Sequence, residues 1–98
     1  MKLRELIEAV REKNLSKDQL ESYRDELSNL SAQMFLEMAD LEKMEALYID
    51  ASLEPTGIAK SRKWAASQKG QRQIEIKNYI RATDKILSSL KSRLYSFY

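Results

Sequence analysis

The sequence contains no cysteine and no histidine. Without cysteine, the chain can form neither a disulfide nor a thiolate nucleophile. Without histidine, it lacks the commonest general base and the commonest side-chain ligand of transition metals. Most catalytic and metal-site chemistries therefore have little to build on. We expect a protein that is not an enzyme and that holds no cofactor and no metal.

Turn-forming residues and long apolar runs are scarce as well. The 98 residues include two glycines and one proline, which is typical of a few long helices. No apolar stretch approaches the roughly 20 residues that cross a membrane. The start of the chain, Met1–Lys13, lacks the apolar core of a signal peptide. We therefore expect a single helical domain over residues 1–98 that is cytoplasmic and has no membrane partner.

Charge is distributed unevenly along the chain. Residues 1–54 carry 7 basic and 13 acidic side chains, whereas residues 55–98 carry 10 basic and 2 acidic ones. Such an asymmetry is balanced either inside the fold or by a partner.

The first helix is predicted from about Lys2 to Lys13. Its apolar residues recur at the spacing that places side chains on one side of a helix: Leu3, Leu6, Ile7 and Val10. At about 12 residues, such a helix is marginal in isolation and must pack on another element.

The second helix is predicted to begin at Lys17 and to end near Ala51. Ser16 and Gln19 have the spacing of a capping box, which marks a helix start. Apolar residues form one stripe over residues 17–31 but spread around the helix over residues 34–49. A helix that is apolar on several sides is buried on several sides, so one neighbouring helix would not cover the second half.

A third helix is predicted from about Ile58 to Tyr95, after a turn that contains Pro55 and a possible cap at Thr56. Gly70 interrupts this helix; we favour a continuous helix with a weak point there over a loop at residues 67–71. The last third carries a heptad pattern, typical of a coiled coil or bundle core. Its positions are Ile76, Ile80, Thr83, Leu87, Leu90, Leu94 and Phe97.

These elements predict an all-α fold: a long, coiled-coil-like antiparallel hairpin, with the short first helix forming a three-helix bundle at one end. If the chain reverses near residue 57, acidic residues of the second helix lie level with basic residues of the third. The pairs that this register predicts are Glu54–Lys60, Glu45–Lys69, Glu42–Arg72, Glu37–Lys77 and Glu21–Arg93. The basic half would then neutralise the acidic half within the hairpin.

The turn end of the hairpin keeps two helices but holds the excess of apolar residues. We predict that this end packs against a second copy or another protein, and a dimeric four-helix arrangement would cover it. The residues assigned to this protein interface are Phe35, Met38, Leu47, Ile49 and Trp64.

Basic residues with an interleaved tryptophan favour a second interpretation. Such residues contact phosphates and stack on a base, so this part of the third helix is a candidate nucleic-acid site. The residues concerned are Lys60, Arg62, Lys63, Trp64, Lys69 and Arg72. Against this interpretation, they do not share one side of a helix, and pairing with the second helix explains their charge.

Two smaller groups remain. The carboxylate pairs Glu42/Glu45 and Glu37/Asp40 have the spacing used in di-metal bundles, but those sites also use histidine, and we favour a solvated face or salt bridges. Near the end of the chain, Phe97 is expected in the core, and Tyr95 and Tyr98 are expected to be partly exposed.

The last part of the sequence contains the segments Lys60-x-x-Lys63-Trp64, Arg72-x-Ile74, Ile80-Arg81-Ala82 and Ile86-Leu87-Ser88-Ser89-Leu90-Lys91. This pattern covers about a third of the chain and resembles small phage-encoded helical-hairpin proteins of unassigned function. The resemblance implies a small accessory or host-interaction protein, acting in the host cytoplasm; it assigns no functional residue.

The sequence does not specify what the protein does. It favours a non-enzymatic protein–protein interaction module, a homodimer or a partner of another protein, with no small-molecule substrate. The alternative is a small nucleic-acid-binding accessory protein that uses the basic third helix.

Overall fold

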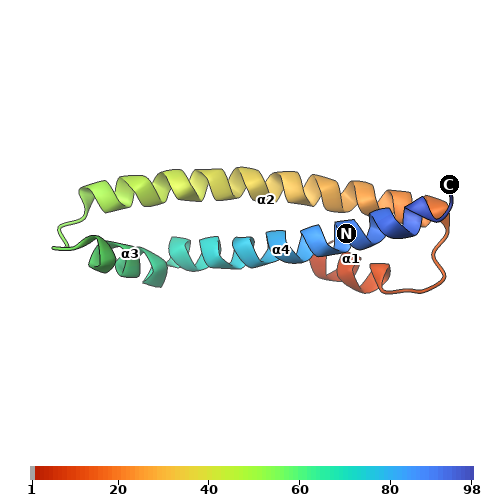
Figure 1. Cartoon of the computed structure of the whole chain (residues 1–98). Coiled ribbons are helices and arrows are strands. Elements are labelled where there is room, and N and C mark those ends of the chain that lie inside the picture. The colour runs from red at the N-terminus through yellow and green to blue at the C-terminus, as the bar shows by residue number, and fades with distance from the viewer. Residues whose placement is uncertain (1) are drawn as a thin grey trace. The chain divides into compact units, whose positions relative to one another are not determined.

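The computed structural model describes residues 2–98, and every regular element in that range is an α-helix (Figure 1). The helices are α1 (Leu3–Val10), α2 (Lys17–Ala51), α3 (Gly57–Ala66) and α4 (Gln68–Tyr95). The prediction of an all-α helical hairpin is confirmed. None of the described helices is long and apolar enough to cross a membrane.

The hairpin divides into two compact units. The terminal unit comprises the residues up to Gln33 together with Ile80–Tyr98, and the turn unit comprises Met34–Tyr79. The terminal unit thus contains α1 and one end of each long helix. The turn unit contains α3 and the other ends. A single domain over residues 1–98 stays a prediction.

The capping box predicted before α2 is present. The Ser16 hydroxyl accepts a hydrogen bond from the Gln19 amide at 3.2 Å, and the Gln19 side chain accepts one from the Ser16 amide at 2.9 Å. Each side chain thereby satisfies a backbone N–H that the first helical turn leaves unpaired. As a result, α2 begins at Lys17 and ends at Ala51, as predicted.

A leucine-rich core joins three helices in the terminal unit, which confirms the predicted three-helix bundle. Leu15, just before the capping box, packs against this core and is partly buried. The core consists of Leu6 and Val10 of α1, Leu20 and Leu27 of α2, and Leu90 and Leu94 of α4.

The first helix is shorter than predicted: it ends at Val10, whereas the sequence predicts an end near Lys13. The Arg93 guanidinium of α4 donates hydrogen bonds to the carbonyl oxygens of Val10 and Glu12, each at 2.6 Å. These bonds satisfy acceptors that the end of a helix leaves free. A side chain distant in sequence therefore holds the C-terminal end of α1.

The heptad pattern predicts the buried side of α4 except at its end. Ile76, Thr83 and Leu90 are fully buried, whereas Phe97 is 51% exposed. The expectation that Phe97 lies in the core is wrong, because α4 ends at Tyr95 and the helical spacing no longer applies beyond it. The hydroxyl oxygen of Thr83 has no hydrogen-bond partner among the residues that the structure describes.

The C-terminal tyrosines are exposed, as predicted, with Tyr95 81% and Tyr98 79% accessible. The Lys17 ammonium lies 4.5 Å from the centre of the Tyr98 ring, and the Tyr98 hydroxyl donates to Glu21 at 3.4 Å. A cation over an aromatic face at this distance is attracted to it. Tyr98 therefore contacts the start of α2 although it is largely solvent-exposed.

The third predicted helix is two helices, and the prediction of a continuous helix with a weak point at Gly70 is wrong. The break lies at Ser67, whose backbone is extended. The Ser67 hydroxyl accepts from the Gly70 amide at 3.0 Å and donates to the carbonyl of Trp64. It thereby caps the start of α4 and satisfies a carbonyl at the end of α3. Gly70 is buried against the backbone of Trp64 and Ala65.

The core of the turn unit is small and centres on Trp64. Trp64 is 5% exposed, and its ring centre lies 5.5 Å from that of Tyr48. The Trp64 indole N–H donates to the Gln73 amide oxygen at 2.6 Å, and the Gln73 amide donates to Glu45 at 3.0 Å. Thr56 caps α3 by accepting from the Ala59 amide, as predicted.

Candidate protein-interaction surface

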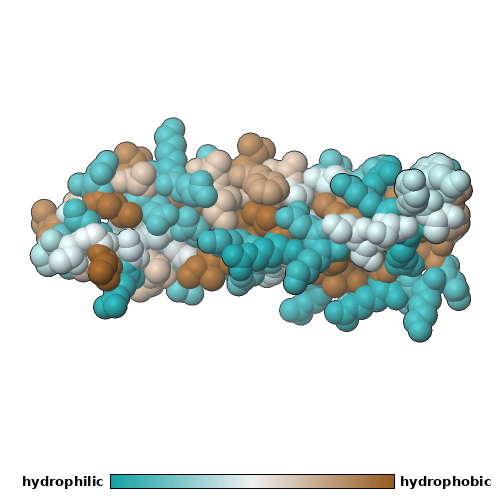
Figure 2. All heavy atoms as spheres, viewed as in Figure 1, coloured by the Kyte–Doolittle hydropathy of each residue, from teal (hydrophilic) through white to brown (hydrophobic). Residues whose placement is uncertain are grey.

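The turn unit exposes many large apolar side chains. On the face shown in Figure 2, apolar side chains form separate areas with hydrophilic ones between them. On this face, the apolar surface is therefore divided into small separate areas. The largest exposed apolar residues of the turn unit are Phe35, Leu36, Met44, Leu47, Leu53, Ile58, Ile74 and Tyr79.

The five predicted interface residues differ in accessibility. Phe35 and Leu47 are 53% and 63% exposed, Met38 and Ile49 are partly buried, and Trp64 is buried. Trp64 therefore belongs to the core of the turn unit, and only a small part of its surface is accessible. The other four residues keep accessible surface.

These four residues do not form one surface. Successive residues are about 100° apart around an α-helix, so Phe35, Met38 and Ile49 share one side of α2 and Leu47 lies on another. The same calculation adds Leu36, which is 70% exposed, to the side of Leu47. The predicted interface residues do not include Leu36, although its place beside Leu47 follows from counting positions around the helix.

A shallow groove lies on each of two sides of the turn unit. One has a volume of about 470 Å³ and is lined by Met38, Glu42, Glu45, Gln73, Ile74 and Lys77. The other has a volume of about 540 Å³ and is lined by Met44, Leu47, Tyr48, Trp64, Ser67, Gln68 and Lys69. The second groove combines an apolar floor with an exposed leucine, which suits an apolar side chain of a partner.

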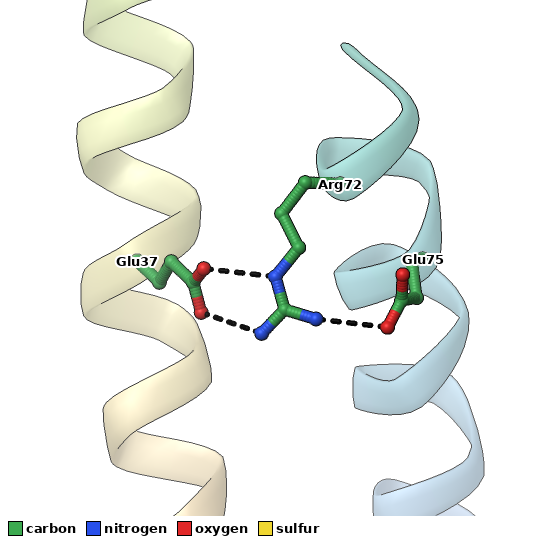
Figure 3. Close-up of polar contacts among 3 residues, drawn as sticks. All are labelled: Glu37, Arg72 and Glu75. Atoms are coloured by element: carbon green, nitrogen blue, oxygen red, sulfur yellow. Dashed lines mark hydrogen bonds and ion pairs between the residues drawn. The ribbon is translucent and has the colours of Figure 1, made fainter. Parts of the chain in front are cut away.

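Arg72 is held by two carboxylates (Figure 3). Its guanidinium donates two hydrogen bonds to Glu37, at 2.9 and 3.1 Å, and one to Glu75 at 2.8 Å. These contacts raise the pKa of Arg72, with the hydrogen bond that Arg72 donates to Glu37 as the largest cause and burial opposing it. Bidentate geometry of this kind fixes orientation as well as charge.

Lys63 is paired as well. Its ammonium lies 3.0 Å from Glu54, and this hydrogen bond is the largest cause of the raised pKa of Lys63. Both groups are substantially exposed, so such a pair adds little stability. Its effect here is to occupy one of the cations assigned to nucleic acid.

The predicted charge register is wrong in its partners. Among the described residues, none of the five predicted pairs forms an ion pair; Glu37 bonds Arg72 and not Lys77, and Glu54 bonds Lys63 and not Lys60. A level match ignores the direction in which side chains point. Acidic residues of α2 do nevertheless bond residues of α4, and Glu54 of the turn bonds Lys63 of α3.

The six residues of the predicted nucleic-acid site are not assembled into one surface. Trp64 is buried, and Lys63 and Arg72 are occupied by carboxylates. In the part of the chain that the structure describes, Lys60, Arg62 and Lys69 form no ion pair. Lys60 and Arg62 are two positions apart on α3 and so point to different sides.

Two of the carboxylates of α2 that have metal-site spacing bond different side chains of α4. Glu45 accepts from Gln73, and Glu37 accepts from Arg72. The described residues bring together no group of three or more carboxylates that could hold a metal ion.

Comparison of the chain with family models, curated proteins and solved structures finds no match.

Proposed function

We propose that this chain is a non-enzymatic interaction module that binds a second copy or another protein through the turn unit. The observation that carries the proposal is the exposure of Leu36 and Leu47, 70% and 63%, on one side of α2. Large apolar side chains exposed together on a helix favour contact with a partner, because burying them removes apolar area from water. The groove beside Leu47 adds a concave apolar site.

A finer proposal concerns the biological setting. The resemblance to small phage-encoded helical-hairpin proteins supports an accessory or host-interaction role in the host cytoplasm. The absence of histidine and cysteine from the sequence supports a role without catalysis.

Charge substitutions on each side of α2 test the interaction proposal. We expect Leu47→Glu to weaken association by tenfold or more, because a carboxylate would replace a leucine that the proposed partner buries. Phe35→Glu tests the opposite side in the same way. Association is measured by sedimentation velocity for the homodimer, and by binding to candidate partner proteins on an immobilised chain.

Tyr95→Glu is the matched control, since Tyr95 is 81% exposed and lies in the terminal unit. Both α2 variants should keep the wild-type circular dichroism spectrum. If neither variant changes any association of the chain, the turn unit is not the binding surface.

The alternative proposal is nucleic-acid binding through Lys60, Arg62 and Lys69, the members of the predicted site that form no ion pair with the described residues. With about three phosphate contacts, the logarithm of the affinity should fall with the logarithm of salt concentration at a slope near −3. Fluorescence anisotropy with a labelled oligonucleotide measures this slope, and Lys60→Glu with Lys69→Glu should abolish binding. Absence of binding at low salt would eliminate this alternative.

A further inference from the structure

The side of α2 that carries Leu36 and Leu47 has a stripe of residues that is complementary to its own reverse order. Leu36, Asp40, Lys43 and Leu47 follow at intervals of four, three and four residues, which is heptad spacing. All four side chains are exposed. Reversing the helix places leucine on leucine and exchanges Asp40 with Lys43.

We propose that this stripe pairs with the same stripe of a second copy, with the two α2 helices antiparallel. This inference rests on the proposed interaction function and specifies its partner. A two-fold axis between residues 41 and 42 places Leu36 opposite the partner's Leu47, and Asp40 opposite the partner's Lys43. A two-fold symmetric interface requires a surface that complements itself, and this stripe does so in both shape and charge.

The central charges select the direction of pairing. In the described part of the chain, neither Asp40 nor Lys43 forms an ion pair, so each can pair with a second copy. In a parallel arrangement, Asp40 would lie opposite Asp40 and Lys43 opposite Lys43. Like charges at facing positions disfavour that arrangement, whereas polar residues at such positions fix register in helix pairs.

The opposite side of α2 pairs less well with a copy of itself. A two-fold axis that brings Phe35 opposite the partner's Ile49 passes through Glu42. It would place Glu42 against the partner's Glu42, and the cation on this side, Lys77, comes from α4 and not from α2. Charge therefore favours the stripe of Leu36 and Leu47 over the side that carries Phe35.

Sedimentation equilibrium tests the pairing. The contact is narrow, so we expect a weak dimer with a dissociation constant of tens of micromolar in order of magnitude. Each substitution occurs twice in a homodimer, so Leu36→Glu and Leu47→Glu should each raise this constant at least about tenfold. Tyr95→Glu should leave it unchanged.

Charge exchange gives a test that a loss of folding cannot imitate. Asp40→Lys alone and Lys43→Asp alone should each weaken the dimer. Each substitution places two like charges opposite each other at both contacts between positions 40 and 43. An equimolar mixture of the two variants should associate again, as should the double variant. Raising the salt concentration should weaken the wild-type dimer.

Single cysteines report the direction of pairing, and the chain has no cysteine of its own. A mixture of Leu36→Cys and Leu47→Cys chains should form a disulfide between the two variants on oxidation. Each variant alone should not, since antiparallel pairing separates identical positions by about 16 Å, beyond the reach of a disulfide.

The possible outcomes separate this inference from the proposed function. A monomer at all concentrations up to about 500 µM, or a dimer unaffected by Leu36→Glu and Leu47→Glu, would overturn the inference. The proposed function would survive either result if Phe35→Glu disrupts association, or if the monomer binds another protein through the turn unit. The absence of both self-association and partner binding would contradict both.

Discussion

Replacing Gly70 with alanine is expected to destabilise the turn unit by about 3 kcal/mol. A Cβ atom at this position would lie 2.7 Å from the carbonyl carbon of Trp64 and 2.9 Å from the Cα of Ala65, and against the Trp64 carbonyl oxygen. These contacts are with backbone, so no change of side-chain rotamer relieves them. The gain in helix propensity, about 1 kcal/mol, is smaller than this cost.

Chemical denaturation followed by tryptophan fluorescence measures the effect, because Trp64 is the chain's one tryptophan and lies in the affected core. Gly57→Ala is the matched control. Nothing lies within 4 Å of a Cβ at Gly57, so that substitution should stabilise the protein, by about 0.5 kcal/mol. Equal stability of Gly70→Ala and the wild type would contradict the close approach of α3 to Gly70.

Leu6→Ala is expected to destabilise the terminal unit by about 3 kcal/mol and to release α1. Leu6 is fully buried and is one of two α1 residues in the core. The helix has 8 residues, too few to remain helical after it leaves the bundle. The substitution should therefore cause a loss of α1 structure at concentrations of denaturant that leave α2 folded.

Amide hydrogen exchange resolves this effect by residue. In Leu6→Ala, the amides of α1 should exchange much faster than in the wild type, and those near Leu41 should change little. Ile58→Ala serves as the control, because Ile58 is 68% exposed and lies in the turn unit. Retention of wild-type protection in α1 would show that Leu6 does not hold this helix.

The sequence predicts well wherever a local signal determines the structure. Ser16 and Gln19 bond each other's backbone whatever the rest of the fold does, so the start of α2 follows from their spacing. Leu90 and Leu94 lie on the buried side because the heptad pattern determines which side of α4 faces the bundle. Both predictions depend on residues close together in the chain.

The sequence predicts poorly where distant residues decide. Arg93 ends α1 through contacts with carbonyl groups that carry no sequence signal. The break at Ser67 has no glutamate or glutamine three residues later, so its cap lacks the reciprocal half of a capping box; Gly70 occupies that position. The sequence marks Gly70 as an interruption of a helix. It does not give the reason for the glycine, which is that the end of α3 approaches the backbone of Gly70 closely.

For the candidate surface too, some features follow from the sequence and others do not. The exposure of Phe35 and Leu47 followed from the excess of apolar residues on α2. Their separation onto two sides of the helix also follows from the sequence, once positions are counted around it. The pairing of Arg72 with Glu37 did not follow, because it depends on the direction of both side chains.

The hold of Arg93 on α1 has a consequence for the order of folding. The bond from Arg93 to the Val10 carbonyl joins residues 83 positions apart. During synthesis, α1 leaves the ribosome before the arginine that bonds its end and the leucines of α4 that cover it. Since loop closure must precede such long-range contacts, we expect the first helix of the chain to be among the last to become stable.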